Sequence, residues 1–113
     1  VYTATKGAVD KLTTSAALEL QELGIRAHVV LPGAAPETPF AANTLELVEN
    51  EGGAPEAYRA PIDAMLKQFE SLEDDGSLTR PSDVADVVWE VVTDPDSPVR
   101  RPAGADAKAL FDG

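Results

Sequence analysis

Small and apolar residues recur at helical spacing in the first part of the chain. Between Thr3 and Leu23 they are Ala8, Val9, Leu12, Ala16, Leu20 and Leu23. Gly24 follows, where a left-handed residue commonly ends a helix. The segment from Ile25 to Leu31 is apolar and partly β-branched and runs up to Pro32-Gly33, which is typical of a buried parallel strand. The pattern therefore predicts a long helix, a glycine turn and a strand, which together make half of a βαβ unit.

Two further helices are expected in the middle of the chain, separated by Gly52-Gly53 and Pro55. The second has an apolar stripe after Pro61, made of Ile62, Met65, Leu66, Phe69 and Leu72. Helical apolar stripes usually belong to a core, so we expect this one to be buried. The region as a whole could serve as a mobile lid.

A last long helix is predicted from Pro81 to Thr93, because proline and acidic residues are favourable in a first helical turn. Its apolar face holds Val84, Val88, Val91 and Val92. We expect Trp89 in the core or in an interface. The segment from Val99 to Pro102 predicts a short edge strand, since proline cannot donate to an interior ladder. Residues 104–113 are expected to be loosely held.

Composition narrows the class of protein. A chain of 113 residues has room for one domain with a modest core. Its formal net charge of −11 argues against the basic surface that nucleic acids and anionic membranes require. With no cysteine and a single histidine, His28, we expect no metal site and assign that histidine no role. The sequence has no bilayer-spanning apolar run and no signal-peptide pattern, so we expect a cytoplasmic protein.

Tyr2 and Lys6 are the candidate catalytic residues. Residues four apart share one face of a helix, so a phenol and an ammonium at this spacing can converge on one bound molecule. A nearby cation favours the phenolate form of tyrosine, which suits proton transfer. The spacing alone is common, and a helix-start aromatic beside a solvated lysine is the alternative interpretation.

A set of linked motifs resembles the C-terminal half of the short-chain dehydrogenase/reductase family. In order they are Tyr2-Thr3-Ala4-Thr5-Lys6-Gly7-Ala8-Val9, Leu18-Glu19-Leu20, Gly24-Ile25-Arg26 and Leu31-Pro32-Gly33. The segments from Arg80 to Ala85 and from Pro98 to Ala107 also resemble parts of that family. The resemblance covers nearly the whole chain and is weakest between residues 43 and 78.

For the fold, the resemblance implies an α/β chain that forms the C-terminal part of a Rossmann-type NAD(P)-binding fold, without its N-terminal βαβ units. Residues 1–113 would be one partial domain. Residues 1–33 would form the catalytic helix and strand, 34–79 the substrate-covering region, and 80–113 the C-terminal helix and edge strand.

For the chemistry, the resemblance implies hydride transfer between NAD or NADP and a small alcohol or carbonyl substrate. Tyr2 would be the acid/base, and Lys6 would hold the nicotinamide ribose and keep the pKa of Tyr2 low. The cofactor-binding residues would be Tyr2, Lys6, Pro32, Gly33, Ala35 and Thr38. Many family members have threonine five residues after the proline, where this chain has Glu37.

The family's glycine-rich phosphate turn, and the serine and asparagine expected upstream of the tyrosine, are not in the sequence. We therefore expect a fragment of a larger oxidoreductase that is inactive alone. Two alternatives stay open. One is a non-catalytic interaction or dimerisation module using the small-residue face of the first helix. The other is an epimerase or dehydratase on the same scaffold. The complete protein is expected to be a homo-oligomer.

Overall fold

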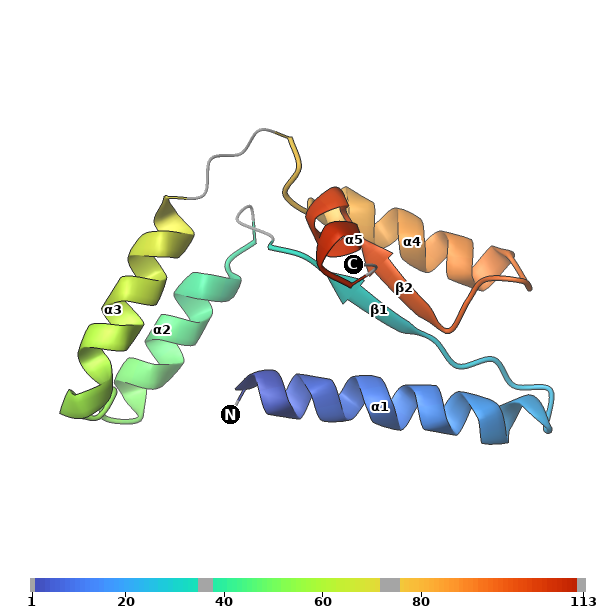
Figure 1. Ribbon diagram of the computed structural model, residues 1–113, viewed down its shortest axis with the longest axis horizontal. Helices are drawn as coiled ribbons and strands as arrows, with labels where there is room; N and C mark the ends of the chain where they lie inside the picture. The colour runs from blue at the N-terminus through green and yellow to red at the C-terminus, as the bar shows by residue number, and fades with distance from the viewer. Residues whose placement is uncertain (1, 35–37, 72–75, 112–113) are drawn as a thin grey trace.

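The structure, a computed structural model, describes residues 2–34, 38–71 and 76–111 (Figure 1). Within these ranges the chain forms five helices and two parallel strands. In order they are α1 (Tyr2–Gln21), β1 (Val29–Pro32), α2 (Phe40–Asn50), α3 (Glu56–Glu70), α4 (Pro81–Thr93), β2 (Arg100–Ala103) and α5 (Ala105–Phe111). The mixed α/β class predicted from the sequence is confirmed.

The end of α1 follows from Gly24. This residue has φ +70°, a left-handed conformation that glycine adopts without steric cost. Its N–H donates to the carbonyl of Gln21, and the N–H of Ile25 donates to the carbonyl of Leu20, both at 3.0 Å. These two bonds form a Schellman motif, which ends the helix and turns the chain back along it. The predicted glycine cap is confirmed.

The two strands pair in parallel, with Val29 opposite Arg100 and Pro32 opposite Ala103. The predicted strand from Ile25 is wrong in its first half, because β1 begins only at Val29. The reason lies in the partner strand. The residues before Val99 form a turn that contains Pro95 and Pro98, which offers no ladder to Ile25–His28.

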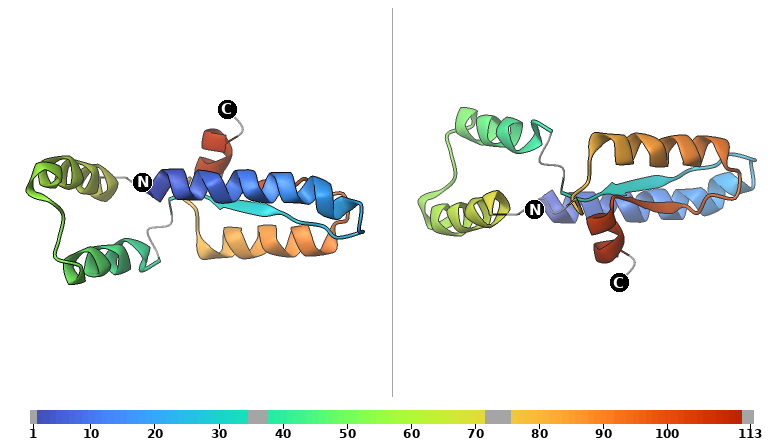
Figure 2. Two further views of the ribbon diagram at one scale, coloured as in Figure 1. Left: turned by 90° about the horizontal axis from the view of Figure 1, so that it is seen from below. Right: turned by 90° about the horizontal axis from the view of Figure 1, so that it is seen from above.

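Three of the helices, α1, α4 and α5, pack against this small sheet. Figure 1 shows the strands between α1 and α4, and Figure 2 shows α4 and α5 on opposite sides of the strands. α1 packs on β1, while α4 and α5 each contact both strands. The buried apolar residues among those described are small or medium in size: Ala17, Leu78, Val87, Ala103 and Ala107.

α4 has the predicted bounds, but its packed face differs from the predicted one. Val87 is buried, while Val88 and Val92 are exposed. The face of α4 that packs toward the sheet therefore holds Val84, Val87 and Val91. Trp89 is 70% exposed, so it does not lie in the core of this chain, and the alternative of an interface stays a prediction.

The C-terminal part is more ordered than predicted. Residues 105–111 form α5, and Ala107 is fully buried. Gly104 precedes the helix with φ +102°, which allows the sharp change of direction after β2. Residues 104–111 are thus held by the sheet, and the expectation of a loose end is wrong for them.

α2 and α3 confirm the two helices predicted in the middle of the chain. α3 begins at Glu56, so Pro61 lies inside it, where it cannot donate to the carbonyl of Ala57. Met65, in the predicted apolar stripe, is 62% exposed, because no other element covers that side of α3 within the described residues. Among the helices that the structure describes, none is long and apolar enough to cross a membrane.

Candidate functional site

The two candidate catalytic residues lie in the first turns of α1. Tyr2 is the first residue of the helix, and its side chain lies outside the described part of the structure. Lys6 is exposed, one turn further along. The convergence of the two side chains therefore stays a prediction.

One face of α1 is anchored to the sheet by a bidentate ion pair. Arg100, the first residue of β2, donates from Nε to Asp10 Oδ1 at 3.1 Å and from Nη2 to Oδ2 at 3.0 Å. Asp10 lies four residues after Lys6, so the two share a helix face. The hydrogen bond and charge of Arg100 lower the pKa of Asp10 from its ordinary value, against the opposing effect of burial. The face that carries Lys6 is therefore the face that contacts the sheet one turn later.

The helix and the strand bring Lys6 and the end of β1 to the same end of the molecule. From Lys6 to Gln21 the helix rises about 23 Å at 1.5 Å per residue. After the Gly24 turn, the extended segment from Ile25 to Pro32 returns by about 23 Å at 3.3 Å per residue. Figure 1 shows the start of α1 and the carboxyl end of β1 toward the same end of the molecule.

The other predicted cofactor-binding residues follow β1. Pro32 is the last residue of the strand and is exposed, and Gly33 is half-buried directly after it. Thr38 is half-buried before α2, whereas Ala35 lies outside the described residues. Ligands of open α/β sheets bind at the carboxyl ends of strands, which is where this segment lies.

The backbone N–H groups after β1 are already engaged inside the protein. Gly33 N–H donates to Thr79 Oγ1 at 3.0 Å, and Ala34 N–H donates to Asp106 Oδ2 at 2.8 Å. These two donors are therefore used to hold the loop and not to hold a ligand. Close packing also requires a glycine at position 33, because a Cβ there would lie 2.3 Å from the carboxylate oxygens of Asp106.

Thr79 and Asp106 were missed by the sequence analysis. Each resembles an ordinary residue near a helix start, Thr79 before Pro81 and Asp106 in the first turn of α5. Burial alone would raise the pKa of Asp106, but hydrogen bonds from Thr79, Ala34 N–H and Ala107 N–H outweigh it and lower that pKa. No local pattern links positions 33, 79 and 106, so only the fold could reveal their contact.

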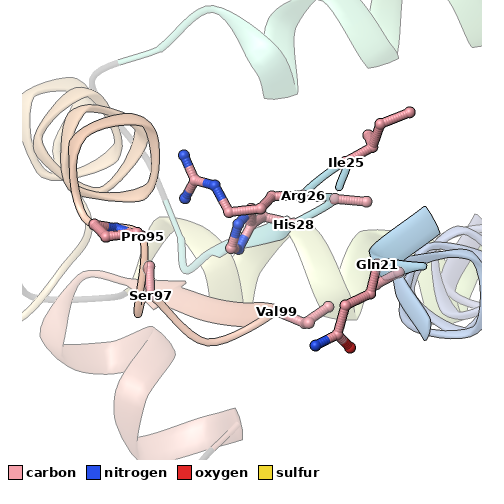
Figure 3. A pocket seen from close by; sticks show the side chains of 9 residues that line it. Gln21, Ile25, Arg26, His28, Pro95, Ser97 and Val99 are labelled. Carbon is pink, nitrogen blue, oxygen red and sulfur yellow. The ribbon is translucent and has the colours of Figure 1, made fainter. Parts of the chain in front are cut away.

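A shallow pocket of about 170 Å³ lies at the opposite end of the sheet (Figure 3). It is lined by Ala17, Gln21, Ile25, Arg26, Ala27, His28, Pro95, Ser97 and Val99, which flank the amino ends of β1 and β2. His28 lies 2.9 Å through Nδ1 from the carbonyl of Pro98, which can only accept, so Nδ1 carries a proton. The pocket therefore lies at the other end of the sheet from Pro32 and Gly33, and it is not the site proposed below.

Two arginines near that end have structural partners. Arg26 donates to the carbonyls of Val91, Val92 and Asp94 at the end of α4, at 2.9 to 3.1 Å. Arg101 pairs with Glu90 and donates to Ser97 Oγ at 2.7 Å. With Arg100 paired to Asp10, both arginines of β2 have an acidic partner.

Comparison with known proteins supports the resemblance for the first part of the chain. Residues 1–48 match the sequence model of the short chain dehydrogenase family, a match that ends within α2. Over this segment, which contains Tyr2, Lys6, Pro32, Gly33 and Thr38, the chain is similar to short-chain dehydrogenases. The family consists of NAD(P)-dependent oxidoreductases. Neither the curated proteins nor the solved structures contain a significant match to the chain.

Proposed function

We propose that the chain is the C-terminal part of an NAD(P)-dependent oxidoreductase of the short-chain dehydrogenase type, which interconverts an alcohol and a carbonyl. The observation that carries the proposal is the family match over residues 1–48, which includes Tyr2 and Lys6 at the start of α1. In this proposal residues 1–33 supply the catalytic helix and strand. Residues 34–79 cover the substrate, and residues 80–113 complete the sheet.

The donor set near the end of β1 fits the nicotinamide half of the cofactor. Lys6 offers an ammonium on the helix face that is anchored through Asp10, and Thr38 offers a hydroxyl in the segment after β1. These groups can donate to ribose hydroxyls and to an amide. Because Gly33 and Ala34 use their N–H groups internally, Pro32 and Gly33 would contribute by close approach of the chain. Ala35, outside the described residues, stays a predicted contact.

In the proposed mechanism Tyr2 transfers the proton, and Lys6 orients the cofactor. A bound nicotinamide supplies or accepts the hydride. In reduction the Tyr2 phenol donates its proton to the carbonyl oxygen, and in oxidation the phenolate takes the proton from the hydroxyl. Lys6 donates hydrogen bonds to the ribose, and its positive charge favours the phenolate form of Tyr2.

The direct test uses the complete enzyme that this proposal implies. Tyr2→Phe should lower kcat at least a hundredfold, the lower end of what a positioned acid/base contributes, while cofactor affinity changes little. Lys6→Met should raise the KM for cofactor as well. Tyr58→Phe and Lys11→Met are matched controls, since Tyr58 is exposed on α3 and Lys11 is exposed on α1. Turnover by Tyr2→Phe at the parental rate would refute the acid/base role.

A second candidate function is association through α1. Leu12 and Leu18, both on this helix, are 70% and 72% exposed, which is a large apolar surface for one helix. Exposed apolar side chains of this kind would pack on a second copy or on the rest of a larger protein. Light scattering of the chain at micromolar concentration checks this, and a stable monomer with unchanged behaviour in Leu12→Gln would count against it.

A further inference from the structure

Three segments that are far apart in sequence meet at the carboxyl end of the sheet. They are the loop after β1, the segment that leads into α4, and the turn between β2 and α5. Thr79, from the second segment, is fully buried at 0% exposure. The side chain of Asp106, from the third, accepts a hydrogen bond from Ala34 N–H. The backbone N–H of Asp106 donates to the carbonyl of Ser77 at 3.1 Å. We call the pair Thr79 and Asp106 the latch.

The latch satisfies each of its polar groups. Thr79 Oγ1 accepts from Gly33 N–H and lies 2.9 Å from the Ala103 carbonyl oxygen and 2.7 Å from Asp106 Oδ1. A hydroxyl has one proton, so it donates to one of these two oxygens at a time. Asp106 Oδ1 also accepts from Ala107 N–H at 2.9 Å. The hydroxyl and N–H groups that donate to the carboxylate are neutral, and polar groups that are paired in this way resist disruption by water.

Two glycines make room for the latch. A Cβ on Gly33 would overlap the Asp106 carboxylate, and a Cβ on Gly104 would lie 2.1 Å from Thr79 Oγ1. Real atoms do not approach so closely, so either side chain would displace the latch. Gly33 has no positive φ, which means that close packing, and not backbone conformation, requires a glycine there.

We infer that Thr79 and Asp106 are positioning residues that fix the backbone of Gly33 and Ala34, and with it the proposed cofactor contact of Pro32 and Gly33. The inference rests on the proposed function. Holding the N–H groups of two successive residues orients the two planar peptide units on either side of Gly33. Pro32 and Gly33, which these two units join, are among the residues assigned to the cofactor. Neither latch residue touches the cofactor itself.

The test compares Thr79→Val and Asp106→Asn with the parent in the complete enzyme. Val keeps the shape of Thr79 but cannot bond Gly33 N–H, and Asn replaces one accepting oxygen of Asp106 by a donor. Both variants should raise the Kd for NAD(P)H, measured by cofactor fluorescence, about tenfold, because buried donors lose their acceptors. The KM for cofactor should rise with it, while kcat at saturating cofactor stays within about twofold.

Controls separate positioning from general destabilisation. Thr79→Ser keeps the hydroxyl and should restore parental affinity. Asp86→Asn changes a carboxylate on the exposed side of α4 and should have no effect. Hydrogen exchange gives a readout without cofactor: the amides of Gly33 and Ala34 should exchange faster in Thr79→Val and in Asp106→Asn, and as in the parent in Thr79→Ser. If Asp106→Asn does not fold, the comparison of Val with Ser at position 79 decides.

Two results would overturn the inference. One is faster exchange at Gly33 and Ala34 with unchanged NAD(P)H affinity. The other is a fall in kcat with an unchanged KM for cofactor. The proposed function fails separately. Retained turnover in Tyr2→Phe together with weakened binding in Asp106→Asn would remove the acid/base role and leave the positioning role standing.

Discussion

At the scale of single residues, two carboxylates with lowered pKa values have different partners. Asp10 is paired with the guanidinium of Arg100 at 3.0 Å on the side of α1, whereas Asp106 is held by a hydroxyl and backbone N–H groups. Charge pairs near solvent are screened by salt, but hydrogen bonds from neutral donors are not. The two residues should therefore respond differently to ionic strength.

We predict that the stabilising effect of Asp106 depends on pH. Its pKa is lowered in the folded state from an ordinary value of 3.8, so its contribution is present above that value and is lost as the pH falls through the folded-state pKa. In urea unfolding, the difference between the parent and Asp106→Asn should be largest above about pH 5 and should shrink steadily below pH 3.8.

Salt provides the internal comparison for this experiment. Raising the ionic strength to about 1 M should reduce the effect of Asp10→Asn, whose partner is charged, and leave that of Asp106→Asn nearly unchanged. An effect of Asp106→Asn that is constant from pH 6 to pH 3 would contradict the lowered pKa.

At the scale of elements, α4 shows which parts of the fold the sequence could predict. Its start was predicted correctly because the signals are local: Pro81 begins the helix, and Asp83 accepts from Arg80 N–H at 2.9 Å. The end of α4 was also predicted, but the side chain that bonds its last carbonyls was not. Arg26, which lies 65 residues before Val91, donates to three carbonyls there, and no local pattern indicates such a contact.

We predict that Arg26→Gln loosens the end of α4. The guanidinium fork bonds three carbonyls where the helix dipole is negative, and Gln supplies fewer donors and no charge. Because the site is exposed, the free energy of unfolding should fall by only about 1 kcal/mol. Amides in the last turn of α4 should exchange faster, while those of its first turn should not.

Arg59→Gln is the matched control. Arg59 lies on α3 and makes one long bond, 3.4 Å, to the carbonyl of Ala54. It should change neither stability nor exchange in α4. Equal effects of the two substitutions would show that the contacts of Arg26 with α4 contribute nothing.

At the scale of the whole molecule, the chain is more extended than a compact domain. Its radius of gyration is 16.8 Å, against about 13 Å expected for a globular domain of this length. Figure 2 shows the cause, since α2 and α3 stand beyond the end of the sheet. Among the described elements, the substantial contacts join α1, α4 and α5 to the strands, and neither α2 nor α3 takes part in them.

We predict that α2 and α3 are much less protected than the rest of the chain. Helices of 11 and 15 residues are marginal in water without tertiary packing. Their amides should exchange at least about a hundredfold faster than those of β1 and the middle of α4, as measured by hydrogen exchange. Equal protection in all of these elements would show that α2 and α3 are packed more firmly than their contacts indicate.

The sequence predicted the order of elements well and the candidate site only in part. Helical spacing and glycine or proline punctuation are local, so α1, its Gly24 cap and α4 were found. The contacts that hold the end of β1 are not local, since Ala34 bonds a residue 72 positions away. Tyr2 and Lys6 are candidates because of a motif and stay a prediction, whereas Thr79 and Asp106 belong to no motif and required the fold.

The parallel pairing of β1 with β2 also governs how the chain can vary in length. The paired residues Val29 and Arg100 enclose a long loop, and the entropy of closing such a loop grows only with the logarithm of its length. Doubling that loop would cost only about 0.6 kcal/mol. Insertions or deletions between α2 and α3 should thus leave the sheet nearly as stable as before. The same sheet could therefore carry connecting regions of many different lengths.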